Sequence, residues 1–483
     1  MTRRVVVGPF NRVEGDLEVA LDITNGRVRA AYVNSLMYRG FEQILRDKHP
    51  LDALVYVPRI CGICSVAQSA AAAQALARAM NLTPPENGRW AANLTLAAEN
   101  IADHLSHFYL FFMPDFARDC YRARPWHEAA AARFKAVSGN AAADFLPARA
   151  RFMNVMGYLA GKWPHTLSLQ PGGSSRPLEA AEIVRLSLLL AEFRAFLERT
   201  LFGDKLENVA VLDSEAALLA WMEPRAASAD LPHFLAIAHD LELHKLGRAT
   251  DRFMSYGAYD EAEGRLFPSG FWENGAVHTL NVAAIREDVS HSWMEGDVAL
   301  APEHGVTLPR PDKADAYSWC KAPRLGGNVV ETGALARQLI AGHPLARDLV
   351  ERHGGNVTAR VVARLLEVAC VLPVMETWVR RIRPGEPFCH AATALEDASS
   401  VGMVEAARGS LGHWLEVRQG KIHNYQIIAP TTWNFSPRDT TGEPGALEQA
   451  LVNTPAVERD GNAPVAVQHV VRSFDPCMVC TVH

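Results

Sequence analysis

Apolar and polar residues alternate in three short segments at the start of the chain. The segments are RVVVGPF at 4–10, LEVALDI at 17–23 and RVRAAYV at 27–33. Alternation is typical of strands with one buried face, and Asn25 followed by Gly26 favours a two-residue hairpin turn. The sequence therefore predicts an N-terminal β-meander.

Beyond the meander, apolar residues recur at the three- and four-residue spacing of helices. The first such segment begins at Ser65 as SVAQSAAAAQALARAM. Cys64 directly precedes it, so we expect its thiolate at a helix N-terminus, where the helix dipole favours negative charge. Glycine- and proline-containing stretches at 255–330 and 430–465 predict loops and short strands. Further helices are predicted at 90–113, 177–202, 207–222, 229–245 and 357–383.

The composition indicates one large folded body. The chain has 483 residues, of which 49% are hydrophobic and 21% charged, so it can bury a sizeable core. No stretch rich in serine and glycine, or in proline, separates one part from another. We therefore predict an α+β fold with a mainly helical core, an N-terminal β-meander and further short strands, in a single interwoven domain over residues 1–483.

The charge pattern argues against several classes of partner. The net charge is −6, and lysine and arginine are dispersed, so no basic patch for nucleic acid or an anionic membrane surface is indicated. No run of about 18 apolar residues predicts a membrane span, and the N-terminus lacks the apolar centre of a signal peptide. We expect a cytoplasmic protein without a nucleic-acid partner.

Four of the eight cysteines form two Cys-x-x-Cys pairs at opposite ends of the chain. Cys61 and Cys64 lie in VPRICGIC, and Cys477 and Cys480 lie in DPCMVCTVH, close to the last residue. Chain ends are normally frayed, so ligands held there indicate a site that joins both ends. A soft-metal centre with four thiolates is the first hypothesis. The isolated cysteines are expected to be small buried apolar residues: Cys120, Cys320, Cys370 and Cys389.

Two other uses of cysteine pairs fit less well. A structural zinc site also takes four thiolates, but zinc ribbons place their pairs roughly 15–20 residues apart. A thioredoxin-like redox motif needs a helix N-terminus beside a parallel sheet, which the pattern around these pairs does not predict. A catalytic metal bound by thiolates is favoured, and an interaction protein with structural zinc remains the alternative from another class.

Further motifs occur in order along the chain. They are RVEG at 12–15, RGFE at 39–42, RICGIC at 59–64, DHLSHFY at 103–109, RGSLGHW at 408–414, PTTWNFSPRD at 430–439 and DPCMVCTVH at 475–483. This ordered set resembles the large subunit of the nickel-iron hydrogenases, and the resemblance covers nearly the whole chain. It implies the nickel-iron hydrogenase large-subunit fold and hydrogenase activity.

The resemblance implies roles for the four cysteines and for one threonine. Cys61 and Cys477 would bind nickel alone, whereas Cys64 and Cys480 would bridge nickel to an iron that also carries cyanide and carbon monoxide. Thiolates suit both metals. Thr431 would hydrogen-bond a cyanide; without the resemblance it could equally cap a helix or a turn. The implied cofactor is a NiFe(CN)2(CO) centre.

The resemblance also implies heterolytic cleavage of dihydrogen, which needs a base for the proton. A thiolate that binds nickel could take the proton and pass it to Glu14, which matches the proton-exit carboxylate of the family. Arg408 is the other candidate, as a base or an electrostatic stabiliser, although a guanidinium is normally always charged. Asp103 and Asp475 would orient Arg408, because a buried arginine needs carboxylate partners. We favour the route through Glu14.

A second cation site is implied near the end of the chain. Glu42, the backbone carbonyl of Ile427 and His483 match the family's hard-cation site, where oxygen ligands suit Mg2+ or Ca2+. His104 and His107 lie three residues apart and could share a helix face. We expect them to be hydrogen-bonded or packed histidines near the site and not a metal-binding pair.

Several residues depart from the pattern of the catalytic members. Gln68 stands where these usually carry a histidine, and glutamine does not titrate near neutral pH. Ile63 and Phe111 replace a smaller valine and a leucine, so a gas tunnel ending at the metals would narrow and slow dioxygen more than dihydrogen. Ordinary core packing is the alternative for both. Asp16 and Ala407 also depart, from a histidine and a proline.

These departures are most similar to the regulatory, H2-sensing branch of the family. The predicted function is H2 sensing with slow H2 oxidation and signalling to a histidine kinase. The remaining cysteines are single, so electrons would leave through a small subunit with iron-sulfur clusters, and we expect the heterodimers to pair. If the chain ending at His483 is the gene product, it needs no C-terminal cleavage, as in the sensors. An O2-tolerant uptake hydrogenase that feeds a respiratory chain is the runner-up.

Overall fold

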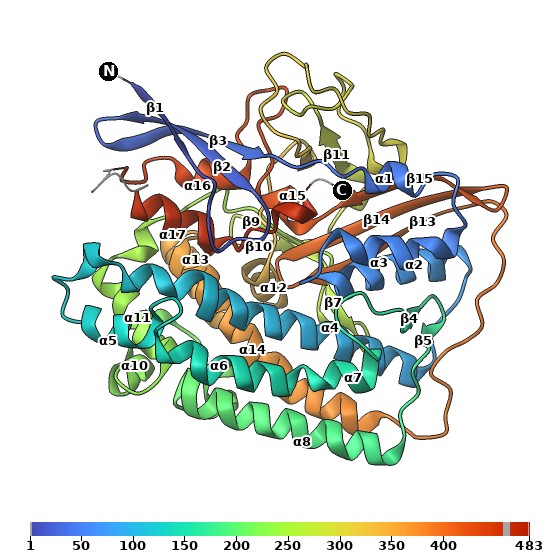
Figure 1. The fold of residues 1–483 in the computed structure, drawn as a ribbon, viewed down its shortest axis with the longest axis horizontal. Helices are drawn as coiled ribbons and strands as arrows, with labels where there is room; N and C mark the ends of the chain where they lie inside the picture. The colour runs from blue at the N-terminus through green and yellow to red at the C-terminus, as the bar shows by residue number, and fades with distance from the viewer. Residues whose placement is uncertain (1, 457–463, 482) are drawn as a thin grey trace.

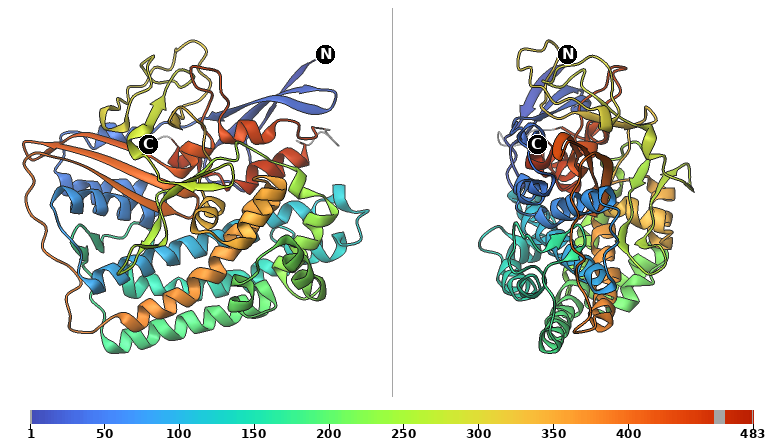
Figure 2. Two further views of the ribbon diagram at one scale, coloured as in Figure 1. Left: turned by 180° about the vertical axis from the view of Figure 1, so that it is seen from behind. Right: turned by 90° about the vertical axis from the view of Figure 1, so that its right-hand side faces the viewer.

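Long helices form one side of the molecule, and hairpins, short strands and loops form the other (Figure 1). The structure is a computed structural model that describes residues 2–456, 464–481 and 483. The view from behind also places the N-terminal strands next to the C-terminal helices (Figure 2). The two ends of the sequence therefore meet, as the positions of the cysteine pairs predicted.

The helices range from single turns to α14, which has 25 residues. The two longest predicted segments before it pass directly into π-helical turns, at His107–Phe112 and Leu197–Phe202. The bounds are α1 Phe41–Ile44, α2 Ala53–Tyr56, α3 Ser65–Ala79, α4 Glu86–Ser106, α5 His127–Phe134, α6 Asn140–Phe152, α7 Asn154–Ala160, α8 Ala180–Phe196, α9 Leu206–Ala210, α10 Glu215–Met222, α11 Asp230–Asp240, α12 Ala334–Ala341, α13 Pro344–His353, α14 Val357–Arg381, α15 Pro430–Asn434, α16 Ala446–Leu451 and α17 Val465–Ser473.

The strands form several small antiparallel sheets. Two of these sheets have three long strands, in the orders β1-β2-β3 and β13-β14-β15. The bounds are β1 Arg3–Val7, β2 Leu17–Thr24, β3 Arg27–Ser35, β4 Leu169–Gln170, β5 Gly173–Ser174, β6 Phe253–Ser255, β7 Ala258–Asp260, β8 Arg265–Phe267, β9 Gly270–Glu273, β10 Ala276–His278, β11 Ile285–Asp288, β12 Ala322–Leu325, β13 Ala398–Ala406, β14 Gly409–Arg418 and β15 Lys421–Ile428.

The predicted N-terminal meander is confirmed. Asn25 and Gly26 form the turn between β2 and β3, and both have positive φ, at 52° and 70°. Positive φ at both central residues is the geometry that an Asn-Gly pair favours. The first strand ends at Val7, because Pro9 offers no backbone N–H for a further pair with β2.

Most predicted helices are present, but their ends differ. The segment predicted at 207–222 is two helices, α9 and α10. Ser214 interrupts it with an extended backbone, and its side chain accepts a hydrogen bond from Ala217 N, which begins a new helix. The segment predicted at 229–245 is α-helical only as far as Asp240, before a 3-10 turn.

The prediction of loops and short strands is confirmed at 255–330 and wrong at 430–465. The second stretch contains α15 and α16, while residues 457–463 lie outside the described residues. Pro430 stands in the first turn of α15, where proline is tolerated because that N–H needs no partner within the helix. The proline that suggested a loop therefore marks a helix start.

The helix α3 packs closely on the sheet β13-β14-β15. A Cβ atom at Gly402 of β13 would lie 1.9 Å from the carbonyl oxygen of Ala71, so glycine is required at this approach. Cys64 precedes α3, and Arg408 lies in the turn between β13 and β14. This packing brings together two elements that carry predicted site residues.

A buried ion-pair network lies between α4, α12, α14 and β13. Arg337 donates to both carboxylate oxygens of Glu367, at 2.8 and 2.9 Å, and to Glu405 at 2.8 Å. His104 Nε2 lies 3.1 Å from Glu367. Although burial opposes it, the charge of Arg337 lowers the pKa of Glu367 to about 2. These buried ion pairs tie the helical side to the sheet β13-β14-β15.

Glu367→Gln should lower the free energy of unfolding by about 3–5 kcal/mol at neutral pH, because it breaks a buried ion pair. The folded pKa of Glu367, about 2, lies below its unfolded value of about 4.3. Its contribution is therefore present above pH 4.3 and is lost as the pH falls from about 4.3 to about 2. Urea unfolding at several pH values measures this.

Glu192→Gln is the control for this prediction, because Glu192 pairs with Arg151 on the surface. It should leave the unfolding midpoint nearly unchanged at every pH. Equal effects of the two substitutions would contradict the role given to the buried network.

None of the helices in the described part of the chain is long and apolar enough to cross a membrane.

Candidate metal centre

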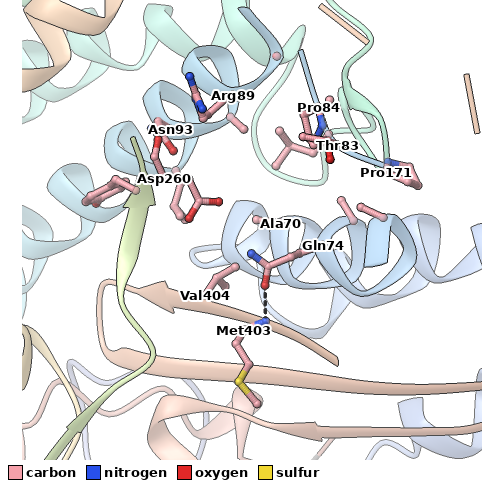
Figure 3. Close-up of a pocket in the computed structure, with 18 of the residues that line it drawn as sticks. Ala70, Gln74, Thr83, Pro84, Arg89, Asn93, Pro171, Asp260, Met403 and Val404 are labelled. Atoms are coloured by element: carbon pink, nitrogen blue, oxygen red, sulfur yellow. Dashed lines mark hydrogen bonds between the residues drawn. The ribbon is translucent and has the colours of Figure 1, made fainter. Parts of the chain in front are cut away.

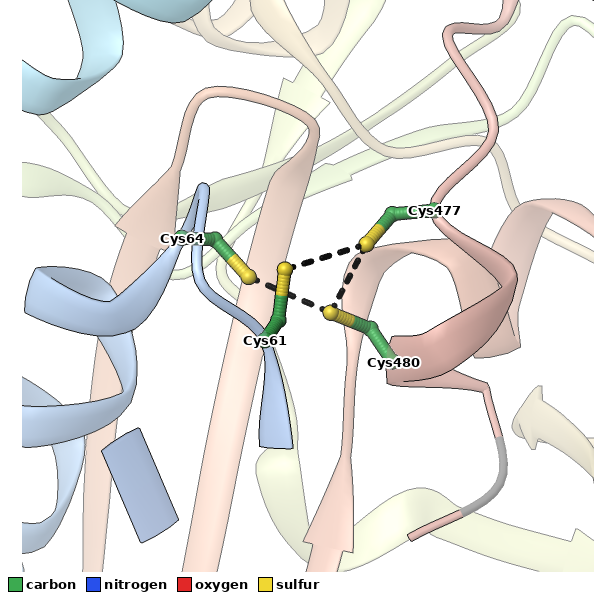
Figure 4. A group of neighbouring side chains, drawn as sticks. All are labelled: Cys61, Cys64, Cys477 and Cys480. Atoms are coloured by element: carbon green, nitrogen blue, oxygen red, sulfur yellow. Dashed lines mark hydrogen bonds between the residues drawn. The ribbon is translucent and has the colours of Figure 1, made fainter. Parts of the chain in front are cut away.

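The four paired cysteines come together in the interior (Figure 4). Their sulfur atoms all lie within 4.8 Å of one another. Cys61 Sγ is 3.4 Å from Cys477 Sγ, and Cys64 Sγ is 3.1 Å from Cys480 Sγ. These separations exceed the roughly 2.05 Å of a disulfide bond, and all four are free thiols. The predicted joining of both chain ends is thus present in the structure.

The geometry of the cluster fits a soft metal. All four side chains are buried, and this is the group of potential metal ligands found among the described residues. Hydrogen bonding within the cluster, from Cys477 first, lowers the pKa of Cys61, whereas burial raises the pKa of Cys477. Uncharged thiols packed this closely would gain little, while four thiolates around a cation satisfy every sulfur.

Backbone pairing holds the first motif of the chain against the last. Glu14 N donates to Pro476 O at 3.2 Å, and Met478 N donates to Glu14 O at 2.7 Å. Gly15 has φ 79°, and a Cβ there would lie 3.0 Å from Val479 N, so the contact requires glycine. Glu14 and Gly15 therefore lie in direct contact with the loop that carries Cys477.

The carboxyl group of Glu14 lies half-buried beside the cysteines. Burial raises its pKa, and the negative charge of Cys61 adds to this effect. The preceding Arg12 donates to Phe111 O at 2.9 Å and pairs with the buried carboxylate of Asp115. These contacts fix the segment in place. A carboxyl group with a raised pKa next to a thiol cluster is suited to accepting and releasing a proton.

Arg408 is held by two buried aspartates, as predicted. Its Nη1 and Nη2 donate to the two oxygens of Asp103 at 2.6 and 3.1 Å, and Nη2 also donates to Asp475 Oδ1 at 3.0 Å. Burial raises the pKa of Asp103 to about 7. Burial acts in the same direction on Asp475, but the charge of Arg408 lowers the pKa of that carboxyl. The guanidinium thus stays charged in a fixed orientation.

Thr431 contacts the second cysteine motif directly. Its Oγ1 accepts a hydrogen bond from Cys477 N at 3.3 Å. The residue lies in the first turn of α15, but the structure gives its side chain no capping hydrogen bond there. The hydroxyl therefore faces the loop that carries Cys477.

Glu42, Ile427 and His483 also lie together. Ile427 N donates to Glu42 Oε1 at 2.8 Å, and His483 Nε2 donates to Ile427 O at 2.6 Å. Sequence reasoning missed Lys321, whose ammonium lies 3.3 Å from Glu42 and 3.4 Å from Glu287. Although burial opposes it, Lys321 lowers the pKa of Glu42 to about 2. The Glu42 carboxylate and the Ile427 carbonyl thus place two oxygen atoms, the ligand type that hard cations prefer, beside His483.

The residues that depart from the catalytic pattern occupy different environments. Gln68 is buried in α3, and its Oε1 accepts a hydrogen bond from His413 Nε2 at 2.8 Å. Ile63 is partly buried and packs against the core, and Phe111 is partly buried in the π-helical turn after α4. Gln68 is therefore a hydrogen-bonded residue of the interior next to the cysteine loop.

His104 and His107 are only partly satisfied. His104 bonds to Glu367, and His107 Nε2 donates to Arg472 O at 2.6 Å. The Nδ1 atoms of both rings are buried without a hydrogen-bond partner among the described residues. Burial lowers the pKa of each ring, to about 3 for His107. Each ring is therefore hydrogen-bonded to a different partner, Glu367 for His104 and the Arg472 carbonyl for His107, as predicted for packed histidines near the site.

The isolated cysteines differ in burial. Cys320 is buried as predicted, whereas Cys370 and Cys389 are only partly buried. The prediction for Cys120 was wrong, because it is exposed in a 3-10 turn. Short turns between helices place most side chains at the surface, and a single cysteine carries no pattern that distinguishes such a turn from a buried segment.

The predicted position of Cys64 at the N-terminus of α3 is confirmed, although its side chain does not cap the helix. Cys64 is its N-terminal flanking residue, but the backbone N–H groups of Val66 and Ala67 donate to Glu99. A carboxylate from α4, and not the Cys64 sulfur, therefore accepts the hydrogen bonds at the N-terminus of α3. Sequence reasoning missed Glu99, although an acidic residue inside an apolar helix, four residues before Asp103, was the available signal.

An open cavity of about 380 Å³ lies between α3, α4 and β13 (Figure 3). Alanine side chains of α3 leave the space, and Gln74 lines it while accepting a hydrogen bond from Met403 N. None of the predicted site residues lines this cavity. The candidate site is thus the closed thiol cluster and not an open pocket.

Comparisons with known proteins give one consistent result. The family pattern described as nickel-dependent hydrogenase matches residues 39–143 and 140–483. The hydrogenase-2 large chain of Escherichia coli (strain K12) is 27% identical, covering 100% of this chain and 97% of that protein. The uptake hydrogenase large subunit of Rhizobium leguminosarum bv. viciae is 29% identical, covering 100% and 95%. The solved Ni-Fe-Se hydrogenase of D. vulgaris Hildenborough gives a TM-score of 0.85 at 28% identity and covers 100% of both chains.

Proposed function

This chain belongs to the nickel-dependent hydrogenase family, and from that premise we propose that it is the H2-sensing large subunit of a regulatory nickel-iron hydrogenase. The hydrogenase identity and the large-subunit fold, both predicted from the sequence, are confirmed. The regulatory role goes further than these findings. It includes slow oxidation of H2 and a signal passed to a histidine kinase.

The observation that carries the proposal is the buried cluster of Cys61, Cys64, Cys477 and Cys480. Its soft donors fit nickel and iron; Cys61 and Cys477 would hold nickel, and Cys64 and Cys480 would hold nickel together with iron. The bound NiFe(CN)2(CO) centre would supply the heterolytic cleavage of dihydrogen. The protein supplies a buried position for this centre and fixed polar groups around it.

The fixed polar groups suit two tasks. Arg408, oriented by Asp103 and Asp475, places a permanent positive charge near the thiol cluster. Glu14 is the residue we assign to take the proton, because it is half-buried with a raised pKa and is tethered to the Cys477 loop. Thr431 would donate its hydroxyl hydrogen to a cyanide ligand, since its oxygen already accepts from Cys477 N.

We assign the hard-cation site to Glu42, the Ile427 carbonyl and His483. Mg2+ or Ca2+ there would link His483 to Glu42 in α1. We also assign an iron-sulfur small subunit as the electron-transfer partner, with heterodimers that pair. The single, scattered cysteines outside the cluster do not offer a four-thiolate iron-sulfur site in the described residues.

Three residues support the sensing role over rapid turnover. Gln68 accepts a hydrogen bond from His413 but cannot titrate, so this side chain offers no proton relay of its own. Ile63 and Phe111 are larger than their usual counterparts and are placed before α3 and after α4. Slow gas entry and a missing relay both limit turnover without preventing H2 binding.

The double variant Ile63→Val with Phe111→Leu should leave H2 oxidation intact but make it sensitive to dioxygen, because smaller side chains would widen a gas tunnel. Activity with H2 in the presence and absence of O2 measures this. Val66→Ala, at a fully buried core position of α3, is the control for general loosening. Unchanged O2 tolerance in the double variant would contradict the tunnel.

The infrared spectrum of the subunit, purified with its native partner, tests the proposed centre. Cyanide and carbonyl stretches together with nickel and iron in the same sample are the expected result. Zinc in a four-thiolate site without such bands would overturn the proposal in favour of a structural protein.

A dioxygen-tolerant uptake hydrogenase is the second candidate, and several relatives with the printed name uptake hydrogenase large subunit favour the uptake role. Steady-state H2 oxidation by the purified heterodimer distinguishes the two. Turnover in the usual range of enzymes, about 1–10³ per second, supports uptake. A much lower rate, together with binding of a histidine kinase in a pull-down from the native cell, supports sensing.

A further inference from the structure

Glu99 lies in the middle of α4 and is buried against the start of α3. Its Oε1 accepts hydrogen bonds from Val66 N at 2.9 Å and Ala67 N at 3.0 Å. Its Oε2 accepts from Trp163 Nε1 at 2.8 Å and from Ser65 Oγ at 3.3 Å. Nitrogen donors face both oxygens, which is the arrangement expected around an ionised carboxylate.

This carboxylate does the work that a side-chain cap normally does. The first N–H groups of a helix have no partner within the helix and need an acceptor. At α3 the flanking residue is Cys64, and its side chain makes no capping hydrogen bond. If the Cys64 side chain capped the helix, its sulfur would be turned away from the cluster. Supplying the acceptor from α4 leaves the Cys64 sulfur free to face the other three cysteines.

Glu99 also connects to the chain segment before the cysteine pair. Ser65 Oγ accepts a hydrogen bond from His165 N at 3.2 Å, and His165 Nδ1 donates to Pro58 O at 2.9 Å. Pro58 belongs to the 3-10 turn Val57–Ile60 that leads directly into Cys61. Contacts through Ser65, Trp163 and His165 thus reach both sides of the Cys61–Cys64 loop.

We propose that Glu99 is a positioning residue for the metal centre, which caps α3 from α4 and thereby fixes where the Cys61 and Cys64 thiolates stand. It touches neither cysteine and acts through the backbone of α3 and the 163–165 segment. The inference rests on the proposed nickel-iron centre, because its effect is expressed in how that centre is held. A packed carboxylate with only a stabilising role would not alter the centre itself.

Glu99→Gln in the heterodimer is the first test. The amide oxygen can still accept from Val66 and Ala67, but the NH2 group then faces the N–H of Trp163, and two donors repel. Burial raises the pKa of Glu99 to about 8, so wild type and variant are compared above that pH. Nickel should be lost to a chelator about 10-fold faster, the lower end of the effect of removing partners of metal ligands. The cyanide and carbonyl bands should also shift.

The double variant Glu99→Gln with Trp163→Phe separates positioning from simple damage. Removing the indole N–H removes the donor that faces the new amide, so nickel retention should return towards the wild-type rate. Trp163→Phe alone should have the smaller effect, because Glu99 keeps its bonds to the α3 backbone. Failure of the double variant to recover retention would overturn the proposed geometry.

Asp204→Asn is the matched control, since Asp204 also accepts from a backbone N–H, Lys205 N at 2.8 Å, and from an indole, Trp221 Nε1 at 3.0 Å. It lies beside α9, and its replacement should lower the melting temperature while leaving nickel release and the infrared bands unchanged. Equal spectral changes in both variants, or none in Glu99→Gln, would overturn the proposal. A wild type without nickel and without the bands would instead contradict the proposed function.

Discussion

Cys477→Ser should deprive the protein of nearly all its nickel and abolish H2 oxidation. The serine hydroxyl does not ionise near neutral pH, and the remaining three thiols cannot enclose two metal ions. Loss of even a hydrogen-bonding partner of a metal ligand costs roughly 10–100-fold in affinity, so loss of a ligand should exceed about 100-fold. Elemental analysis of the purified subunit for nickel and iron measures the effect.

Cys370→Ser is the control for this substitution. Cys370 is a partly buried cysteine of α14 outside the cluster, and its pKa is raised by burial to about 12, so it is an uncharged thiol. Its replacement should leave nickel and iron content unchanged. A Cys477→Ser protein that retained both metals at the wild-type ratio would contradict the four-thiolate centre.

Glu14→Gln should leave the metals bound but slow H2 oxidation by about 10²–10⁴-fold, the usual effect of removing a proton-transfer group. The hydrogen bonds that tie Glu14 to Pro476 and Met478 use backbone atoms, so the substitution preserves them. Glutamine has nearly the same shape but cannot take a proton. Nickel content, infrared bands and H2 oxidation rate should be measured on the same preparation.

The pH dependence gives a second measurement of Glu14. Burial and the charge of Cys61 raise its pKa above the ordinary value of about 4.3, so the proton-accepting form is lost at a higher pH on acidification. As the pH is lowered, wild-type activity should therefore begin to fall while the pH is still above 4.3. The residual activity of Glu14→Gln should lack this step. Asp16→Asn, at an exposed position two residues away, should behave as wild type. An unchanged rate in Glu14→Gln would exclude Glu14 from the proton route.

Local patterns and long-range contacts differ in how far the sequence reveals them. The Asn25-Gly26 turn and the alanine-rich helix from Ser65 follow from neighbouring residues, so periodicity and turn chemistry sufficed. The break at Ser214 and the helix at Pro430 depend on single capping positions within ambiguous stretches. Predicting such boundaries requires knowing which backbone groups find partners elsewhere.

The candidate site shows the same division. The cysteine pairs, Arg408 and its two aspartates were identifiable because ordered motifs linked them to a known family. Lys321 and Glu99 belong to none of those motifs, and each gains its meaning from residues far away in the chain. A buried charge is visible in a sequence only when its partner is also known, and a single sequence does not pair distant residues.

The backbone bonds between the Glu14 segment and residues 476 to 478 have a consequence for how the protein is made. During translation, the first segment leaves the ribosome hundreds of residues before the strand partner that completes it. Until then, its polar backbone groups and half of the thiols remain without their native neighbours. Contacts this distant in sequence also form slowly, because closing so long a loop has a high entropic cost. Binding of a metal by all four thiolates therefore requires synthesis as far as Cys480, and a chain that ends before Cys477 would hold at most two of the four.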